Sequence, residues 1–272
     1  MPASLAHIGW LTKSSNTLRT KDGTPIELWE LKHEPDARVL SEWAKHFRNH
    51  YCDDKQIDLL RAGTPHSRSD YLLKIKFPDA NKKPGPSIRT GDFAEILVAD
   101  YLEYVLNFWV PRTRYDDKTV RNESKKGSDI IGFRFRHTGK SSSSDTLIIF
   151  ESKAQLTGNT ARDILQEAIN HSAKDELRKA ESLNAIKQRL IDREEMDDAN
   201  KIARFQSPED NPFVSLFGAA ALFSSELFVD DVLKSCDTDK HPNKSKLALV
   251  VITGPKLMEL VHKLYAIAAC EA

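Results

Sequence analysis

The sequence predicts an α/β protein, a mixed β-sheet flanked by helices, and three observations support this class. Residues 90–107 carry apolar side chains at helical spacing, and Leu147 to Phe150 is an unbroken apolar run typical of a strand buried on both faces. Predicted helices and strands then follow one another to the end of the chain. The 272 residues, of which 40% are hydrophobic, can form a sizeable core, so we expect a globular protein.

From residue 90 onward, the predicted order is a helix, three strands, a helical zone, two strands and a final helix. The apolar run at residues 217–223 fits either a strand or a helix, and we favour a strand. Pro255 suits the first turn of the final helix, where the missing N–H would have no partner in any case. The predicted strands are residues 112–118, 130–136, 146–153, 217–223 and 247–252, and the predicted helices are residues 90–107, 160–193 and 254–269.

The first 80 residues are predicted to form a smaller N-terminal α+β region that carries no recognisable motif. It contains predicted helices at residues 36–51 and 53–61 and a predicted strand at residues 71–77. Three prolines and a glycine at residues 78–86 indicate a linker or a long loop. We therefore divide the chain into residues 1–80, which could bind a partner, a linker at residues 81–90 and a main domain at residues 91–272.

Composition excludes several classes of protein. The 40 basic residues balance the 40 acidic ones, which argues against a polybasic coat protein but leaves a local basic groove open. Three scattered cysteines without a CxxC motif predict neither a disulfide framework nor a structural zinc site, and they fit a reducing cytoplasm. We expect no secretory signal and no membrane span. Without GxxxxGK or GxSxG, we expect neither ATP hydrolysis nor a serine hydrolase of that type.

Two charged residues stand at the end of the buried run Leu147 to Phe150. Glu151 and Lys153 are two positions apart, so in a strand they point to the same side of the sheet. Burying such groups is costly unless they are paired, solvated or bound to a metal ion. We therefore looked for residues that could lie beside them.

A hairpin between residues 130–136 and 146–153 would bring a second acid to this place. If His137 pairs with Asp145, antiparallel register puts Asp129 opposite Lys153, so that Asp129, Glu151 and Lys153 share one face. A slip of one residue would break this arrangement.

Two converging carboxylates form an oxygen-rich site suited to a hard cation such as Mg²⁺ or Mn²⁺. Asp129 and Glu151 would bind the metal, and Lys153 could orient or deprotonate a water molecule, or stabilise developing charge at phosphorus. Glu95, one turn into the helix that begins near Gly91, is a further candidate ligand. A strand-end salt bridge without catalytic function remains the alternative for these residues.

Asp129, the Glu151-Ser-Lys153 triplet and a preceding helix bearing Glu95 resemble the PD-(D/E)xK nuclease superfamily. The proline that usually precedes the aspartate is absent here, where the chain reads Gly127-Ser-Asp129. The resemblance implies a restriction-endonuclease-like mixed sheet flanked by helices and a metal-dependent phosphodiesterase.

A closer resemblance covers much of the chain after the linker. Four segments are similar to the HamA/AbpA family of nuclease subunits from anti-phage systems that include Hachiman. This resemblance implies a Mg²⁺-dependent DNA endonuclease that acts with a superfamily 2 helicase subunit of the HamB type, to which the N-terminal 80 residues could bind. The segments are Gly91-Asp-Phe-Ala-Glu95-Ile-Leu, Gly127-Ser-Asp129-Ile-Ile-Gly132, Glu151-Ser-Lys153-Ala-Gln155 and Gly218-Ala-Ala-Ala-Leu222.

A basic stretch surrounds the proposed site. Residues 112–136 contain eight basic and four acidic residues, which gives a net charge of +4 within a neutral chain. Because phosphate contacts dominate non-specific DNA binding, we expect Arg121, Lys125 and Lys126 to contact the DNA backbone.

Several alternatives stay open at this level. The chain could be a non-catalytic DNA-binding or regulatory subunit of a helicase complex, or a repair or Holliday-junction nuclease with the same chemistry. Lys174 and Asp175 are expected to be solvated or paired rather than catalytic. His46 and His50 share a helix face where a zinc site is conceivable, but Phe47 stands where a zincin has glutamate, so the pattern alone does not predict one.

Overall fold

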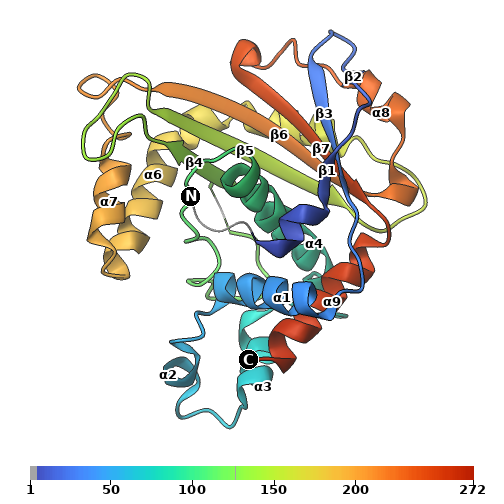
Figure 1. Cartoon of the computed structure of the whole chain (residues 1–272), viewed down its shortest axis with the longest axis vertical. Coiled ribbons are helices and arrows are strands. Elements are labelled where there is room, and N and C mark those ends of the chain that lie inside the picture. Colours follow the sequence, from blue (N-terminus) through green and yellow to red (C-terminus); the bar gives the residue numbers. More distant parts are fainter. Residues whose placement is uncertain (1–4, 126) are drawn as a thin grey trace.

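The computed structural model describes residues 5–125 and 127–272, and within them the chain forms one seven-stranded mixed sheet (Figure 1). Its order is β1-β3-β7-β6-β5-β4, with β2 paired to β3. The four central strands β3, β7, β6 and β5 run parallel, and β1, β2 and β4 are antiparallel to their neighbours. The strands are β1 Leu11–Lys13, β2 Leu18–Arg19, β3 Pro25–Leu31, β4 Ile130–Arg134, β5 Thr146–Gln155, β6 Val214–Ser224 and β7 Leu247–Gly254.

Helices cover both faces of the sheet (Figure 1). Helices α1, α4 and α9 pack on one face in the largest core cluster, while α5 and α8 pack on the other face, with α6 and α7 beside them. None of the described helices is long and apolar enough to cross a membrane. The helices are α1 Ala37–Tyr51, α2 Ile57–Arg61, α3 Arg68–Tyr71, α4 Gly85–Asp100, α5 Ile164–Ser172, α6 Asp175–Asp192, α7 Met196–Ala203, α8 Asp230–Ser235 and α9 Leu257–Cys270.

The predicted strand at residues 217–223 is confirmed as the centre of the sheet, strand β6. Its glycine is required by packing, because a Cβ atom at Gly218 would lie 2.2 Å from the ring of Phe150 on the neighbouring strand. The small residues that follow Gly218 let helices and large side chains approach both faces of β6.

Two predicted strands are wrong. Residues 71–77 form the end of α3 and a π-helical turn, Leu72–Lys76, in which Leu72 is buried while Leu73 and Ile75 are exposed. Their alternating apolar pattern therefore did not reflect a strand with one buried face. Residues 112–118 are an irregular segment that pairs with no strand, and their arginines are bonded to acids of α4 and to Asp129 instead.

The sheet and the core cross the expected boundary at residue 80. Strand β3 pairs with β7, and α1 packs on α9 in the same core cluster as the second half of the chain. Helix α4 begins at Gly85, inside the expected linker at residues 81–90 and ahead of the expected start at residue 90. The N-terminal residues thus complete the sheet that carries the rest of the molecule.

The hairpin between β4 and β5 exists, but its register differs from the predicted one. Ile130 pairs with Phe150 and Ile131 with Ile149, so the partner of each β4 residue lies two positions earlier than expected. Asp145 sets this register at the loop, because its Oδ1 accepts a hydrogen bond from the Arg136 backbone N–H at 2.8 Å. A displacement of two residues keeps every side chain on its predicted face, whereas a displacement of one would have reversed them.

Candidate functional site

Asp129, Glu151 and Lys153 come together where β4 and β5 lie side by side. Asp129 directly precedes β4, and its Oδ2 accepts a hydrogen bond from the Ser152 backbone N–H at 3.1 Å. On β5, Lys153 donates a hydrogen bond from Nζ to Glu151 Oε1. The side chain of Glu151 is 5% exposed and that of Lys153 is 26% exposed. The structure therefore groups the three residues, with the lysine on the solvent side.

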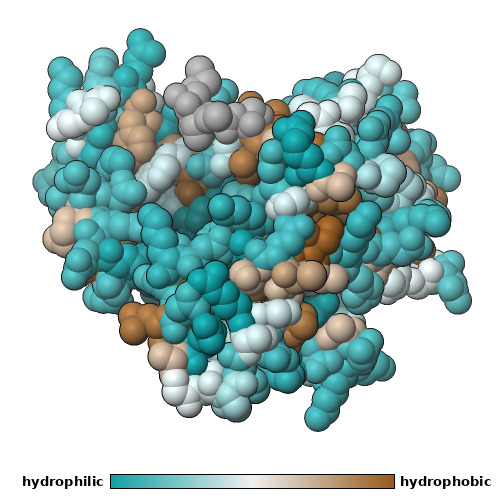
Figure 2. All heavy atoms as spheres, turned by 60° about the horizontal axis from the view of Figure 1, so that its bottom comes forward, coloured by the Kyte–Doolittle hydropathy of each residue, from teal (hydrophilic) through white to brown (hydrophobic). Residues whose placement is uncertain are grey.

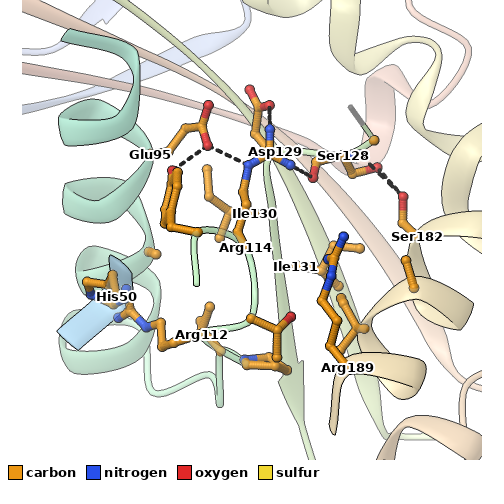
Figure 3. Close-up of a pocket in the computed structure, with 18 of the residues that line it drawn as sticks. His50, Glu95, Arg112, Arg114, Ser128, Asp129, Ile130, Ile131, Ser182 and Arg189 are labelled. Atoms are coloured by element: carbon orange, nitrogen blue, oxygen red, sulfur yellow. Dashed lines mark hydrogen bonds and ion pairs between the residues drawn. The ribbon is translucent and has the colours of Figure 1, made fainter. Parts of the chain in front are cut away.

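Glu95 reaches this cluster from α4 through an arginine (Figure 3). Arg114 Nε donates to Glu95 Oε2 at 2.6 Å, and Arg114 Nη2 donates to Asp129 Oδ1 at 2.9 Å. The same guanidinium donates to the backbone carbonyls of Ser128 and Lys125. Arg114 thus links α4, the residues before β4 and two of the predicted site acids.

The buried acids hold their protons more tightly than free carboxyls do. Burial raises the pKa of Glu95 to about 8, against the opposing effect of Arg114 and with a further contribution from Asp129. Burial, and then the charge of Asp129, raises the pKa of Glu151 to about 7. Burial alone would lower the pKa of Lys153, but Asp129 and Glu151 outweigh it and raise that pKa. One arginine and one lysine therefore leave this group of acids short of positive charge.

Two further residues belong to the cluster although the sequence did not single them out for it. His171 Nδ1 lies 3.2 Å from Glu151 Oε1, and Asp175 is fully buried with its Oδ1 accepting from Ser128 Oγ at 3.1 Å. Burial, and then the charge of Glu151, raises the pKa of Asp175 to about 7. We had expected Asp175 to be solvated or paired. His171 and Asp175 are four residues apart, so in a helix they lie on the same side. This spacing is the one signal in the sequence that relates the two residues.

An open cleft of about 860 Å³ is lined by Glu95, Asp129 and Lys153 of the cluster, whereas Glu151 and Asp175 lie buried behind its wall. Its walls come from the start of α4, the residues around Lys125 and the end of β5 with the loop that follows. Gln155 stabilises that loop through two hydrogen bonds. Its Nε2 donates to the Thr160 carbonyl, and its Oε1 accepts from the Arg162 N–H. A second cavity of about 240 Å³ begins at Glu95 and Asp129 and extends along α4 to His50 (Figure 3).

The three basic residues predicted to contact DNA have different surroundings. Lys125 lines the open cleft and forms an ion pair with Asp117 at 2.8 Å. Arg121 is bonded within the protein, donating to the Leu73 carbonyl and to Asp79 Oδ2. Lys126 lies outside the described residues. Of this set, Lys125 is the one whose position over the site the structure defines.

Comparison with known proteins gives one match. A model of the HamA family matches residues 6–268, which is nearly the whole chain. The chain belongs to the HamA family. This membership indicates a component of the Hachiman anti-phage system. Searches of curated proteins and of solved structures found no match.

The match includes both the N-terminal strands and the cluster of acids, so the HamA region spans the entire sheet. This agrees with the absence of a structural break at residue 80 in the part of the chain that the structure describes.

The donor set of this HamA protein fits a hard divalent cation. Carboxylate oxygens are the ligands that Mg²⁺ and Mn²⁺ prefer, and burial raises the pKa values of Glu95 and Glu151 in spite of their ion pairs. In this structure Arg114 lies between Glu95 and Asp129, and Lys153 contacts Glu151. Among the residues described, these acids do not form a set of three ligand atoms within 4.8 Å of one another.

Proposed function

We propose that this HamA protein is a Mg²⁺- or Mn²⁺-dependent DNA endonuclease of the PD-(D/E)xK superfamily with a restriction-endonuclease-like core. The observation that carries the proposal is the convergence of Asp129, Glu151 and Lys153 on neighbouring strands beneath an open cleft. An acid before one strand and an acid–lysine pair two residues apart on the next is the arrangement that the superfamily resemblance implies.

Each residue has a distinct task in this proposal. Asp129 and Glu151 would hold the metal ion, and Glu95 or Asp175, whose pKa values burial raises to about 8 and about 7, would hold or release a proton near neutral pH. When bound, a divalent cation supplies Lewis acidity at the scissile phosphate. Lys153, the most exposed member of the central trio, orients the attacking water and stabilises negative charge that develops at phosphorus.

The cleft supplies a path for the phosphodiester backbone. Five lysine and arginine side chains line the cleft: Lys83, Arg114, Lys125, Lys153 and Arg162. Lys125 is held by a single ion pair with Asp117, whose side chain is 40% exposed, and can exchange that partner for a phosphate at little cost. Binding of free DNA should therefore weaken as the salt concentration rises.

Membership in the HamA family supports the biological setting that we propose. The protein acts in the cytoplasm in defence against phage, together with a superfamily 2 helicase subunit. The helicase delivers the nuclease to DNA, which accounts for a basic surface of limited extent on a chain of zero net charge.

A non-catalytic role is the second candidate, and the ion pairs favour it. Arg114 and Lys153 already compensate Asp129 and Glu151 in this structure, as they would in a purely structural network. In that case the chain would be a DNA-binding or regulatory subunit, and removing Lys153 would not change any cleavage by the complex. A repair or junction-resolving nuclease would share the chemistry but would be encoded without a neighbouring helicase.

Cleavage of supercoiled plasmid distinguishes these functions. We expect the purified chain, alone or with its helicase subunit, to nick plasmid with Mg²⁺ or Mn²⁺ and not with EDTA. Glu151→Gln and Lys153→Ala should each reduce the rate by about 100-fold or more, because each removes a group that acts in the transition state. A single-stranded DNA and an RNA substrate in the same assay establish which nucleic acid is cleaved.

Glu209→Gln and Lys240→Ala are matched controls, since both residues are exposed and lie outside the cleft. They should cleave at the rate of the unmodified protein. Full activity of both Glu151→Gln and Lys153→Ala would rule out the proposed site, and cleavage that persists in EDTA would rule out metal dependence.

A further inference from the structure

A second group of polar side chains lies away from the strands, between α1 and α4. His46 and His50 are one turn apart on α1, and Asp100 is the last residue of α4. The three potential ligand atoms lie within 4.8 Å of one another, and the side chain of Asp100 is completely buried. His50 is also buried, while the side chain of His46 retains 18% exposure.

The contacts of His46 Nε2 compete for a single proton or lone pair. His46 Nε2 lies 2.9 Å from Asp100 Oδ1 and 3.3 Å from His50 Nε2. A neutral imidazole nitrogen either carries one proton or offers one lone pair. If His46 Nε2 donates to Asp100, it has no lone pair left for His50, and if it accepts from His50, it has no proton for Asp100. Both contacts can be hydrogen bonds only if one N–H of His46 is shared between Asp100 and His50, which weakens each of them.

A metal ion resolves this conflict, since both nitrogens and the carboxylate oxygen can then point their lone pairs at one centre. Tetrahedral zinc with bonds of about 2.0–2.1 Å keeps its ligand atoms about 3.3 Å apart. The separations of 2.9 and 3.3 Å in this group are close to that value. We propose that His46, His50 and Asp100 form a zinc site that joins α1 to α4.

The surroundings orient the ligands as a metal site requires. His7 Nε2 lies 3.0 Å from the second carboxylate oxygen of Asp100, and the His7 ring stacks on Trp43 at 4.3 Å between centroids. Arg112 Nη2 donates to Asp100 Oδ1 at 2.7 Å and also bonds Glu103. Such partners fix the carboxylate in one position, which is the usual role of residues behind metal ligands.

The ligand chemistry selects the metal. Two imidazoles and one carboxylate suit Zn²⁺, whereas Mg²⁺ prefers an all-oxygen site. Three protein ligands leave a fourth position for water, and His50 also lines the cavity of about 240 Å³ that extends toward Asp129.

Zinc binding to the full chain tests the proposal without reference to DNA cleavage. After the protein is stripped with a chelator and dialysed, competition with a chromophoric zinc indicator should reveal one tight site. His46→Gln and His50→Gln should each weaken it by about 100-fold or more, since even partners behind the ligands contribute 10–100-fold. Cobalt substituted into the unmodified protein should give the visible absorption bands of tetrahedral coordination.

Two controls make the result specific. His137→Gln replaces an exposed histidine and should bind zinc as the unmodified protein does, and so should Glu151→Gln, which affects only the other cluster. The proposal is overturned if the unmodified protein binds no zinc, if cobalt shows no tetrahedral bands, or if His46→Gln binds zinc with unchanged affinity. Should His50→Gln fail to fold, the cobalt spectrum and the more exposed His46 still decide the question.

Discussion

Two arginines that stand two residues apart compensate two different groups of acids, with opposite results. Arg112 and two histidines surround Asp100 and, although burial opposes them, hold its pKa well below the usual range. Arg114 bonds both Glu95 and Asp129, yet burial prevails and raises the pKa of Glu95 to about 8. The partners of Asp100 outweigh the effect of its burial, and those of Glu95 do not.

This difference indicates which cation each group can accept. The acids around Arg114 would gain from a hard divalent charge, because burial raises the pKa values of Glu95 and Glu151 although Arg114 and Lys153 pair with them. The group around Arg112 already has its charge balanced and instead offers neutral nitrogen lone pairs, which suit a borderline metal such as zinc. Both groups line the same cavity, one near each end of its stretch along α4.

Removal of each arginine should have the largest effect. Arg114→Ala and Arg112→Ala each leave buried acids without a partner, which should lower the free energy of unfolding by about 3 kcal/mol. Millimolar Mg²⁺ should partly restore the free energy of unfolding of Arg114→Ala but not that of Arg112→Ala. The reason is that only Arg114→Ala frees the carboxylates of Glu95 and Asp129 for the cation. Urea unfolding with Mg²⁺ and with EDTA measures both effects.

Arg38→Ala is the control for these two variants, since Arg38 forms only an exposed pair with Glu42. It should change the free energy of unfolding by less than about 0.5 kcal/mol. An equal response of Arg112→Ala and Arg114→Ala to Mg²⁺ would show that the two groups do not differ in the way described.

The pH dependence of metal affinity should have a smaller effect. With the pKa of Glu151 raised to about 7, protons compete with the metal below that pH. The apparent Mg²⁺ affinity should fall by about tenfold per pH unit below pH 7 and level off above it, as for a metal linked to one proton. Isothermal titration calorimetry at a series of pH values measures how the Mg²⁺ affinity depends on pH. If Glu151→Gln shows the same pH dependence, the proton that competes with Mg²⁺ belongs to another group.

A further effect is expected on the pH dependence of stability without metal. Because the pKa of Glu95 is 4.5 when free and about 8 in the folded protein, the folded state binds one more proton between these values. The free energy of unfolding therefore falls as pH rises through this window. Glu95→Gln should remove roughly 3 kcal/mol of that decline between pH 5 and 8. Thermal melts of the unmodified protein and of Glu95→Gln in EDTA, compared at each pH, measure this difference. An identical decline in both proteins would show that Glu95 is not its source.

Sequence patterns were sufficient to predict the elements whose residues must be apolar because they are buried. The apolar runs of β5, β6 and β7 and the stripe of α4 were found because residues buried on one or both faces must be apolar. The face shared by Asp129, Glu151 and Lys153 was also found, since a two-residue error in register preserves it.

Other features had no local signature. Strand β3 joins the sheet only by pairing with β7, more than 200 residues later, and no short pattern reports such a pairing. The arginines of residues 112–118 were mistaken for part of a strand because their bonds to α4 and Asp129 are tertiary contacts. Asp175 is the first residue of α6 and is buried, whereas the charged side chains of that helix indicated a surface exposed to solvent. Its position beside Glu151 could therefore not be inferred from the sequence.

Binding of Mn²⁺, followed by electron paramagnetic resonance, tests the central claim most directly, because it needs neither DNA nor a helicase subunit. The account predicts that the unmodified protein binds one Mn²⁺ ion that Mg²⁺ displaces, and that Asp129→Asn and Glu151→Gln each weaken binding by at least about tenfold. Glu209→Gln should bind as the unmodified protein does. Unchanged Mn²⁺ affinity in both Asp129→Asn and Glu151→Gln would contradict the assignment of the metal site to these strands.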